Sequence, residues 1–169
     1  MTTDKALELL SGAKFSEDGV YRYALWRFWN YPACRDGVAR AAMFIMANPS
    51  TAGAMRDDPT TMKCAKYAQR WGYDGIYVGN LFAVVGTHWV GTPEPGEKIG
   101  ELCDYWLGIM QNSSILHIAA WGFMGEYHPD RAKEVAAMFP DLHHLGLSVK
   151  GIPKHPLYLN LDIEPTLWK

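Results

Sequence analysis

An apolar run that stops at an Asn-Pro-Ser-Thr segment constrains the fold of this chain more than any other feature. Residues 43–47 are all apolar, and Asn48-Pro49-Ser50-Thr51 follow directly. Such runs are typical of strands that are buried on both faces of a parallel sheet. Ligands of open α/β sheets bind beyond the carboxyl ends of these strands. We therefore expect Asn48, Pro49 and Ser50 to lie in a ligand-binding loop, where the fixed φ of proline holds the Asn48 carboxamide in place.

The same layout recurs twice further along the chain. The run 75–79 precedes Asn80, and an apolar run around Leu145 precedes His155. Helices are predicted between these runs, so a right-handed, doubly wound parallel sheet is the natural architecture. Because parallel strands end at one edge of a sheet, we expect Asn48, Asn80 and His155 to meet there.

The predicted elements are a helix over 4–11, strands over 20–29 and 40–47, a helix over 59–71, a strand over 75–80, a helix over 96–111, a strand over 115–121, a helix over 130–139 and a strand over 142–147. The first two strands flank turn residues, which predicts an antiparallel pair. We expect one α/β domain over 1–169 with three layers. Its central, mostly parallel four-stranded sheet is flanked by helices and carries an antiparallel N-terminal strand.

Composition and missing motifs exclude several classes of protein. The 169 residues carry a net charge of −2, which disfavours tight non-specific binding to nucleic acid. No apolar stretch approaches the roughly 20 residues of a membrane helix, and the N-terminus does not resemble a signal peptide. We therefore expect a cytoplasmic protein without membrane contact. The three Cys form no Cys-x-x-Cys pair and the six His show no metal-ligand spacing, so we expect no metal and no cofactor.

Two interpretations compete for the loop after the first buried run. Asp57-Asp58-Pro59-Thr60 is typical of a helix start. In the catalytic interpretation, Asn48 positions a water and Asp58 or Asp57 acts as general base. In the structural interpretation, Asn48 and Ser50 close a turn and Asp58 only caps the helix. The cap is preferred for Asp58, whereas the place of Asn48 at the ligand-binding edge favours a functional role.

Asn80 and His155 are the other polar candidates. A carboxamide offers both a donor and an acceptor, so Asn80 matches the amide edge of a nucleobase, and Phe82 would stack on a planar ligand. The alternative is a satisfied strand-end Asn beside a core Phe. Prolines flank the Lys154-His155 pair and fix the direction of His155, which can donate to a developing oxyanion. Further candidates for contacting a phosphate are Arg22, Arg27, Arg56 and Arg70.

Several segments together resemble an uncharacterised domain family of bacteria and phages that is known by number rather than function. The match covers most of the chain and implies no activity. The segments are Tyr21-Arg22-Tyr23, Asn48-Pro49-Ser50-Thr51, Asp57-Asp58-Pro59-Thr60, Trp71-Gly72-Tyr73, Asn80-Leu81-Phe82-Ala83 and His155-Pro156-Leu157-Tyr158.

A more remote resemblance is to the uracil-DNA glycosylase superfamily, whose four landmarks occur here in order. They are resembled by Met46-Ala47-Asn48-Pro49, Val78-Gly79-Asn80, Ala120-Trp121-Gly122 and His155-Pro156. The resemblance implies that Asn48 positions the attacking water, that Asn80 reads a pyrimidine edge, and that His155 steadies the base oxyanion. We also expect Trp121, in the third of these segments, and Lys154, in a local basic patch with Lys150, to lie beside the substrate. Two positions depart from the pattern, since Ala47 replaces a glycine and Leu157 replaces a serine.

The sequence thus favours a protein that recognises a nucleobase, a nucleotide or DNA and hydrolyses an N-glycosidic bond. The alternative is a module on the same fold that binds a nucleotide or a protein partner without catalysis, which the two departures favour. A phosphate-ester hydrolase would need more carboxylates or His at the strand ends than the sequence provides.

Overall fold

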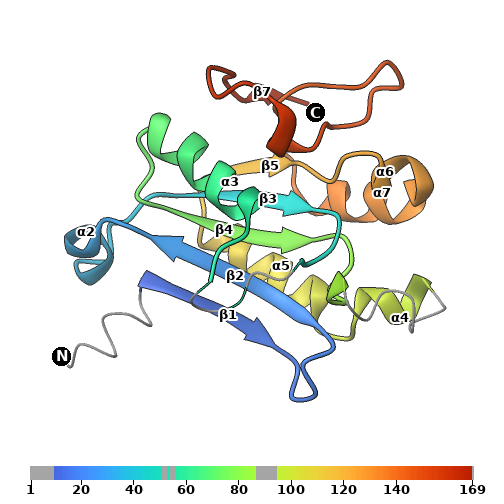
Figure 1. The fold of residues 1–169 in the computed structure, drawn as a ribbon, viewed down its shortest axis with the longest axis horizontal. Coiled ribbons are helices and arrows are strands. Elements are labelled where there is room, and N and C mark those ends of the chain that lie inside the picture. The colour runs from blue at the N-terminus through green and yellow to red at the C-terminus, as the bar shows by residue number, and fades with distance from the viewer. Residues whose placement is uncertain (1–9, 51–52, 54–55, 87–94, 169) are drawn as a thin grey trace.

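The computed structural model describes residues 10–50, 53, 56–86 and 95–168, and Figure 1 shows helices on both sides of a central sheet. In chain order the elements are β1 Ser11–Phe15, β2 Arg22–Phe28, α2 Tyr31–Arg35, β3 Ala41–Met46, α3 Pro59–Arg70, β4 Gly75–Asn80, α4 Pro95–Ile99, α5 Cys103–Asn112, β5 Leu116–Ala119, α6 Met124–Tyr127, α7 Pro129–Met138, β6 Leu142–His144, the 3₁₀ helix η2 Pro156–Tyr158 and β7 Thr166–Leu167.

One sheet of seven strands runs in the order β1-β2-β4-β3-β5-β6-β7. The four strands β4, β3, β5 and β6 are parallel, while β1, β2 and β7 pair antiparallel with their neighbours. The α/β class and the parallel core are therefore confirmed, but the sheet has more strands than predicted. The helix predicted over 4–11 lies outside the described residues except for its last two, and Ser11 already belongs to β1.

The predicted antiparallel pairing of strands 20–29 and 40–47 is wrong. β2 pairs with β1 and β4, and β3 lies between β4 and β5. The segment predicted as a turn contains α2 instead, which begins after Asn30, whose side chain accepts a hydrogen bond from the backbone N–H of Ala33. This helix separates the two strands, so they cannot form a tight hairpin, and β4 takes the place beside β2.

The centre of the sheet is buried on both faces, as the apolar run predicts. All six residues of β3 are buried. Met43 and Ile45 pack toward α5 and α7, and Phe44 and Met46 pack toward α3, because successive strand side chains point to opposite faces. α5 and α7 cover one face, and α3 with residues 159–163 covers the other, which confirms the three layers (Figure 1).

The single helix predicted over 96–111 is interrupted. α4 ends at Ile99 and α5 begins at Cys103. Gly100 lies between them with a φ of +78°, a left-handed conformation that favours glycine. A Cβ atom at this position would also lie 2.7 Å from Cδ1 of Tyr21. The chain therefore turns here and passes close to the start of β2.

The strand directions bring several loops to one edge of the sheet. β3 and β4 end side by side, since Met46 pairs with Asn80, and β3 pairs with β5 through Ile45 and Ala119. β2 runs the other way, so its first residue, Arg22, lies at the same edge, where its backbone N–H donates to the carbonyl oxygen of Ala83 over 2.8 Å. This edge lies on the right in Figure 1, where the arrowheads of β3 and β4 point.

Candidate functional site

A pocket of about 740 Å³ opens at the carboxyl edge of the parallel strands. This volume falls in the range of roughly 300–1,000 Å³ that is usual for small-molecule sites. Seven of the nine residues predicted to act in catalysis or substrate binding line it together: Asn48, Ser50, Asp58, Asn80, Trp121, Lys154 and His155. They come from the ends of β3, β4 and β5, the start of α3 and the segment before η2.

Two of the predicted site residues do not line this pocket. Phe82 is fully buried, and its ring lies against that of His128 with 4.8 Å between centroids. Pro49 is also buried, and its carbonyl oxygen accepts the backbone N–H of Gly86 over 2.9 Å. Phe82 therefore packs in the core, and Pro49 holds the Asn48 loop against residue 86. The sequence indicates where the loops lie but not which way each side chain in them points.

Asn80 is the most unusual polar side chain of the pocket. It is only 2% exposed, and neither Oδ1 nor Nδ2 has a hydrogen-bond partner. Buried polar groups are almost always paired, because leaving one unpaired costs roughly 1–3 kcal/mol. The Asn80 carboxamide thus has an unused acceptor oxygen and an unused donor nitrogen in a residue that lines the pocket.

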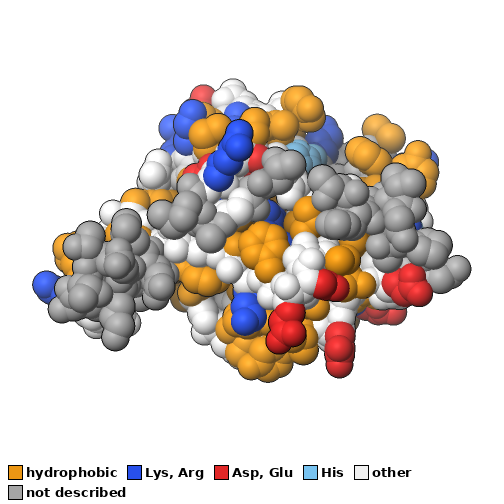
Figure 2. Space-filling model, turned by 60° about the horizontal axis from the view of Figure 1, so that its bottom comes forward, with side chains coloured by type: hydrophobic (Ala, Val, Ile, Leu, Met, Phe, Trp, Pro, Cys, Tyr) orange, Lys and Arg blue, Asp and Glu red, His pale blue; other side chains and the backbone are white. Residues whose placement is uncertain are grey.

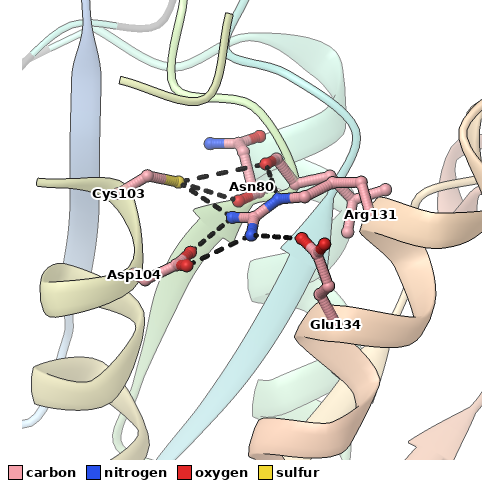
Figure 3. Close-up of polar contacts among 6 residues, drawn as sticks. Asn80, Cys103, Asp104, Arg131 and Glu134 are labelled. Carbon is pink, nitrogen blue, oxygen red and sulfur yellow. Dashed lines mark hydrogen bonds and ion pairs between the residues drawn. The ribbon is translucent and has the colours of Figure 1, made fainter. Parts of the chain in front are cut away.

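An ion-pair network centred on the buried Arg131 supports the backbone beside Asn80. The Arg131 Nε donates to the carbonyl oxygen of Leu81 over 2.8 Å, and the guanidinium also bonds Asp104 and Glu134. Burial alone would lower the pKa of Arg131, but the hydrogen bond and charge of Asp104 outweigh it and raise the pKa. Figure 3 shows the Asn80 side chain pointing away from this guanidinium.

Cys103 contacts the same strand end from α5. Its thiol donates to the carbonyl oxygen of Asn80 over 3.4 Å, and burial raises the pKa of the thiol to about 12, so it remains protonated (Figure 3). The backbone carbonyls of Asn80 and Leu81 therefore both accept hydrogen bonds, while the side chain of Asn80 has no partner. The network thus holds the backbone at the end of β4 and makes no hydrogen bond with the carboxamide.

The loop after β3 joins the start of α3 through Asp58. Asp58 is the N-cap of α3, where its Oδ1 accepts the backbone N–H of Thr61 over 2.6 Å, and its other oxygen accepts the hydroxyl of Ser50. Burial alone would raise the pKa of Asp58, but these hydrogen bonds outweigh it and lower the pKa. The capping role predicted for Asp58 is confirmed. In this arrangement both carboxylate oxygens already accept hydrogen bonds.

The Asn48 carboxamide bends back on its own loop, since Nδ2 donates to the carbonyl oxygen of Pro49 over 3.2 Å. Arg27 holds the continuation of this loop, because its guanidinium donates to the carbonyl oxygen of Gly53 over 2.6 Å and to Asp57 over 2.7 Å. Arg27 and Asp57 are therefore structural partners of the loop. Neither lines the pocket.

His155 has a defined tautomer. Its Nδ1 accepts the backbone N–H of Leu157 over 3.3 Å at the start of η2, so the proton of the neutral ring resides on Nε2. Burial lowers the pKa of His155 below its ordinary value, although the carboxylate of Asp58 opposes this shift. A neutral imidazole with an Nε2–H donor thus lines the pocket.

Arg22 supplies a buried positive charge at the same site. It is 3% exposed and lines the pocket, and burial lowers the pKa of its guanidinium to about 10, with the Asp58 carboxylate acting in the opposite sense. The guanidinium stays charged at neutral pH. Although the sequence names Arg22 among four arginines, only the antiparallel course of β2 brings it here. Of the others, Arg27 pairs with Asp57 and Arg70 with Asp162.

The pocket mouth carries exposed aromatic rings that the sequence analysis missed. Phe123 is 69% exposed and Tyr158 is 88% exposed, and both line the pocket. Phe123 follows Gly122 at the end of β5, and Tyr158 lies in η2. The segment His155-Pro156-Leu157-Tyr158 belongs to the family resemblance. The exposure of the Tyr158 ring, however, depends on which distant residues pack against it, and the sequence gives no signal of that.

Metal clusters and membrane spans are not found in the described part of the chain. No group of three or more His, Cys, Asp or Glu side chains there lies in a position to hold a metal ion. Among the described residues, no helix has the length and apolar character needed to cross a bilayer.

Comparison with known proteins gives a family but no activity. Residues 22–157 match the model of a family described as protein of unknown function (DUF1643). No curated protein and no solved structure matches the chain significantly. The expected kinship with a numbered domain family of unknown function is therefore confirmed, and the pocket itself must indicate the chemistry.

Proposed function

We propose that this chain, which belongs to the DUF1643 family of proteins of unknown function, recognises a nucleobase in its pocket and hydrolyses the N-glycosidic bond of the bound nucleoside unit. The observation that carries the proposal is the Asn80 carboxamide, whose donor and acceptor are buried and unpaired in a residue that lines the pocket. The edge of a pyrimidine or purine with adjacent donor and acceptor groups complements both atoms at once.

The other residues that line the pocket suit a ligand with a flat ring and an attached phosphate group. Trp121 and Met46 provide apolar lining, and Arg22 provides a positive charge that would attract a phosphate group attached to the sugar. The ordered resemblance of the strand-end segments to the uracil-DNA glycosylase superfamily supports the same substrate class.

The hydrolytic step would use His155 and Asn48. A water held by Asn48 forms a bond to C1′ of the sugar, while the C1′–N bond breaks and its electron pair stays on the base. The Nε2–H of His155 stabilises the developing negative charge on the base. The proton released by the water neutralises the departing base, so atoms and charge balance.

A second candidate function is nucleotide binding without catalysis. It is favoured by Asp58, both of whose oxygens already accept hydrogen bonds and whose lowered pKa makes it a weak base. The Nδ2 of Asn48 is also engaged with its own loop. In this case the pocket binds its ligand but leaves the glycosidic bond intact.

Two measurements test the proposal. Thermal unfolding in the presence of the free nucleobases, the nucleosides and the deoxynucleoside monophosphates is expected to show a raised Tm for at least one base. Release of that base from the nucleoside unit is expected in the wild type and to be lost in Asn48→Ala and His155→Ala with the fold intact. Binding of a base without its release from the nucleoside unit would support the non-catalytic module. If no base binds, both candidate functions are refuted.

A further inference from the structure

We infer that the exposed rings of Phe123 and Tyr158 form an aromatic rim that stacks a second base beside the one in the pocket, so that the ligand is a single-stranded oligonucleotide. This inference rests on the proposed function, which it deepens by naming the substrate class. Phe123 and Tyr158 both line the pocket, and both rings are largely exposed to solvent.

The size of the pocket is the first argument. A nucleobase has about ten heavy atoms. If each atom takes the roughly 30 Å³ that one molecule occupies in liquid water, the base fills at most about 300 Å³. The pocket measures about 740 Å³. A base at Asn80 therefore leaves room for its sugar and for part of a neighbouring unit of the strand.

Each ring of the rim also has a neighbouring ring. The ring of Phe123 packs edge-to-face on that of Tyr127, with centroids 5.8 Å apart and an interplanar angle of 86°. Tyr158 lies in η2, two residues after Pro156, and its ring centroid is 6.5 Å from that of His155. Bases stack on such aromatic surfaces irrespective of sequence.

Charge argues for a single strand rather than a duplex. Tight duplex binding relies on many phosphate contacts, whereas single-strand binding also gains affinity from bases that stack on aromatic rings. The Lys and Arg side chains among the described lining residues are Arg22 and Lys154. Nearby Lys150 is paired with Glu126. Acidic side chains gather at the lower right of the face in Figure 2, while a His and several basic side chains lie in its upper half.

The test compares ligands that differ only in length. The probes are the deoxynucleoside monophosphates, including dUMP, and single-stranded tetranucleotides that carry the same base at an inner position. Affinities are measured by calorimetry for the wild type, Phe123→Ala and Tyr158→Ala. Tyr105→Ala is the matched control, because Tyr105 is 61% exposed, packs edge-to-face on Trp106 and lies outside the pocket lining.

The expected result is tighter binding of the tetranucleotide than of the mononucleotide. Each rim variant should weaken tetranucleotide binding by between about 5-fold and about 100-fold, as expected for one lost stacking contact, and change mononucleotide binding less than twofold. Tyr105→Ala should change neither. Equal affinities for both probes, or rim variants that bind the tetranucleotide like the wild type, would overturn the aromatic rim while leaving the base pocket in place. Absence of binding for every probe would refute the proposed function as well.

Discussion

Gly122 and His155 approach each other so closely that a Cβ atom on Gly122 would lie 3.1 Å from the Cβ of His155. Gly122 lies three residues after β5 with a φ of +62°, and its backbone N–H donates to the carbonyl oxygen of Pro153 over 3.1 Å. The contact joins two loops that are more than thirty residues apart and sets where the imidazole lies in the pocket.

Gly122→Ala is therefore expected to lower both stability and ligand affinity. A left-handed alanine costs roughly 1–2 kcal/mol, and the new methyl group must also displace His155. Gly72→Ala is the matched control, because Gly72 has a φ of +78° and no atom within 4 Å of its would-be Cβ. Chemical denaturation should show similar backbone costs for both variants, and only Gly122→Ala should lose ligand binding. Equal ligand affinities in the two variants would contradict the proposed role of the contact.

Asn80→Leu is expected to separate stability from function. Leucine has a similar size and removes two buried polar atoms that have no partner, so the free energy of unfolding should rise by about 1 kcal/mol while base binding is lost. Asn30→Leu provides the contrast, since Asn30 bonds Asp74 over 2.6 Å and the backbone N–H of Ala33 over 3.3 Å. That variant should lose stability. A destabilised Asn80→Leu would indicate that Asn80 is structurally satisfied.

Arg131→Lys is expected to weaken the support beneath Asn80. A lysine keeps the charge but cannot reach the Leu81 carbonyl and the Asp104 carboxylate with the fork geometry of arginine, so stability should fall by roughly 1–3 kcal/mol. Arg70→Lys alters an exposed pair with Asp162 and should change stability by less than about 0.5 kcal/mol. If Arg131 positions Asn80, nucleobase affinity should drop in the first variant only.

The pH dependence of stability should contain contributions from His155 and His144. Burial lowers the pKa of both, and the charge of His143 lowers that of His144 further. The unfolded chain therefore takes up these protons first, near its ordinary pKa of about 6.5, so stability is complete above that pH and declines as pH falls toward the folded pKa values.

Denaturant unfolding between pH 7.5 and 5.5 checks this expectation. His155→Gln and His144→Gln should each show a shallower decline in stability than the wild type. Only His155 lines the pocket, and protonation of its Nδ1 would remove the acceptor for the Leu157 N–H. The His144→Gln variant should therefore retain wild-type ligand affinity throughout. Identical pH slopes in all three proteins would contradict the lowered pKa values of these two rings.

The sequence was sufficient to locate the strands that build the pocket. The residues of β3 are all apolar, and those of β4 before Asn80 are mostly apolar with two glycines. Such runs are typical of strands that are covered on both faces of a sheet. The polar residue that ends each run then lies at one edge, which is why Asn48 and Asn80 could be placed together. Asp58 before Pro59 marked the start of α3 in the same local way.

Other features depend on contacts between distant segments. The residues 22–28 by themselves do not indicate that β2 pairs with β4 rather than β3. The pairing depends on which strand of the sheet has an edge without a neighbour when β2 joins it. The place of Arg22 in the pocket follows from that choice. Likewise, Phe82 could be read as a stacking ring, but the space beside it is filled by His128.

Periodicity, strand-end residues and helix caps were determined by the chain alone, because each depends on neighbours within a few positions. The tertiary structure decided which side chains face the pocket and which remain unpaired. Asn80 illustrates the division: its position at a strand end is a local property. The tertiary structure decided that its carboxamide has no hydrogen-bond partner, while Arg131 and Cys103 satisfy the adjoining backbone carbonyls.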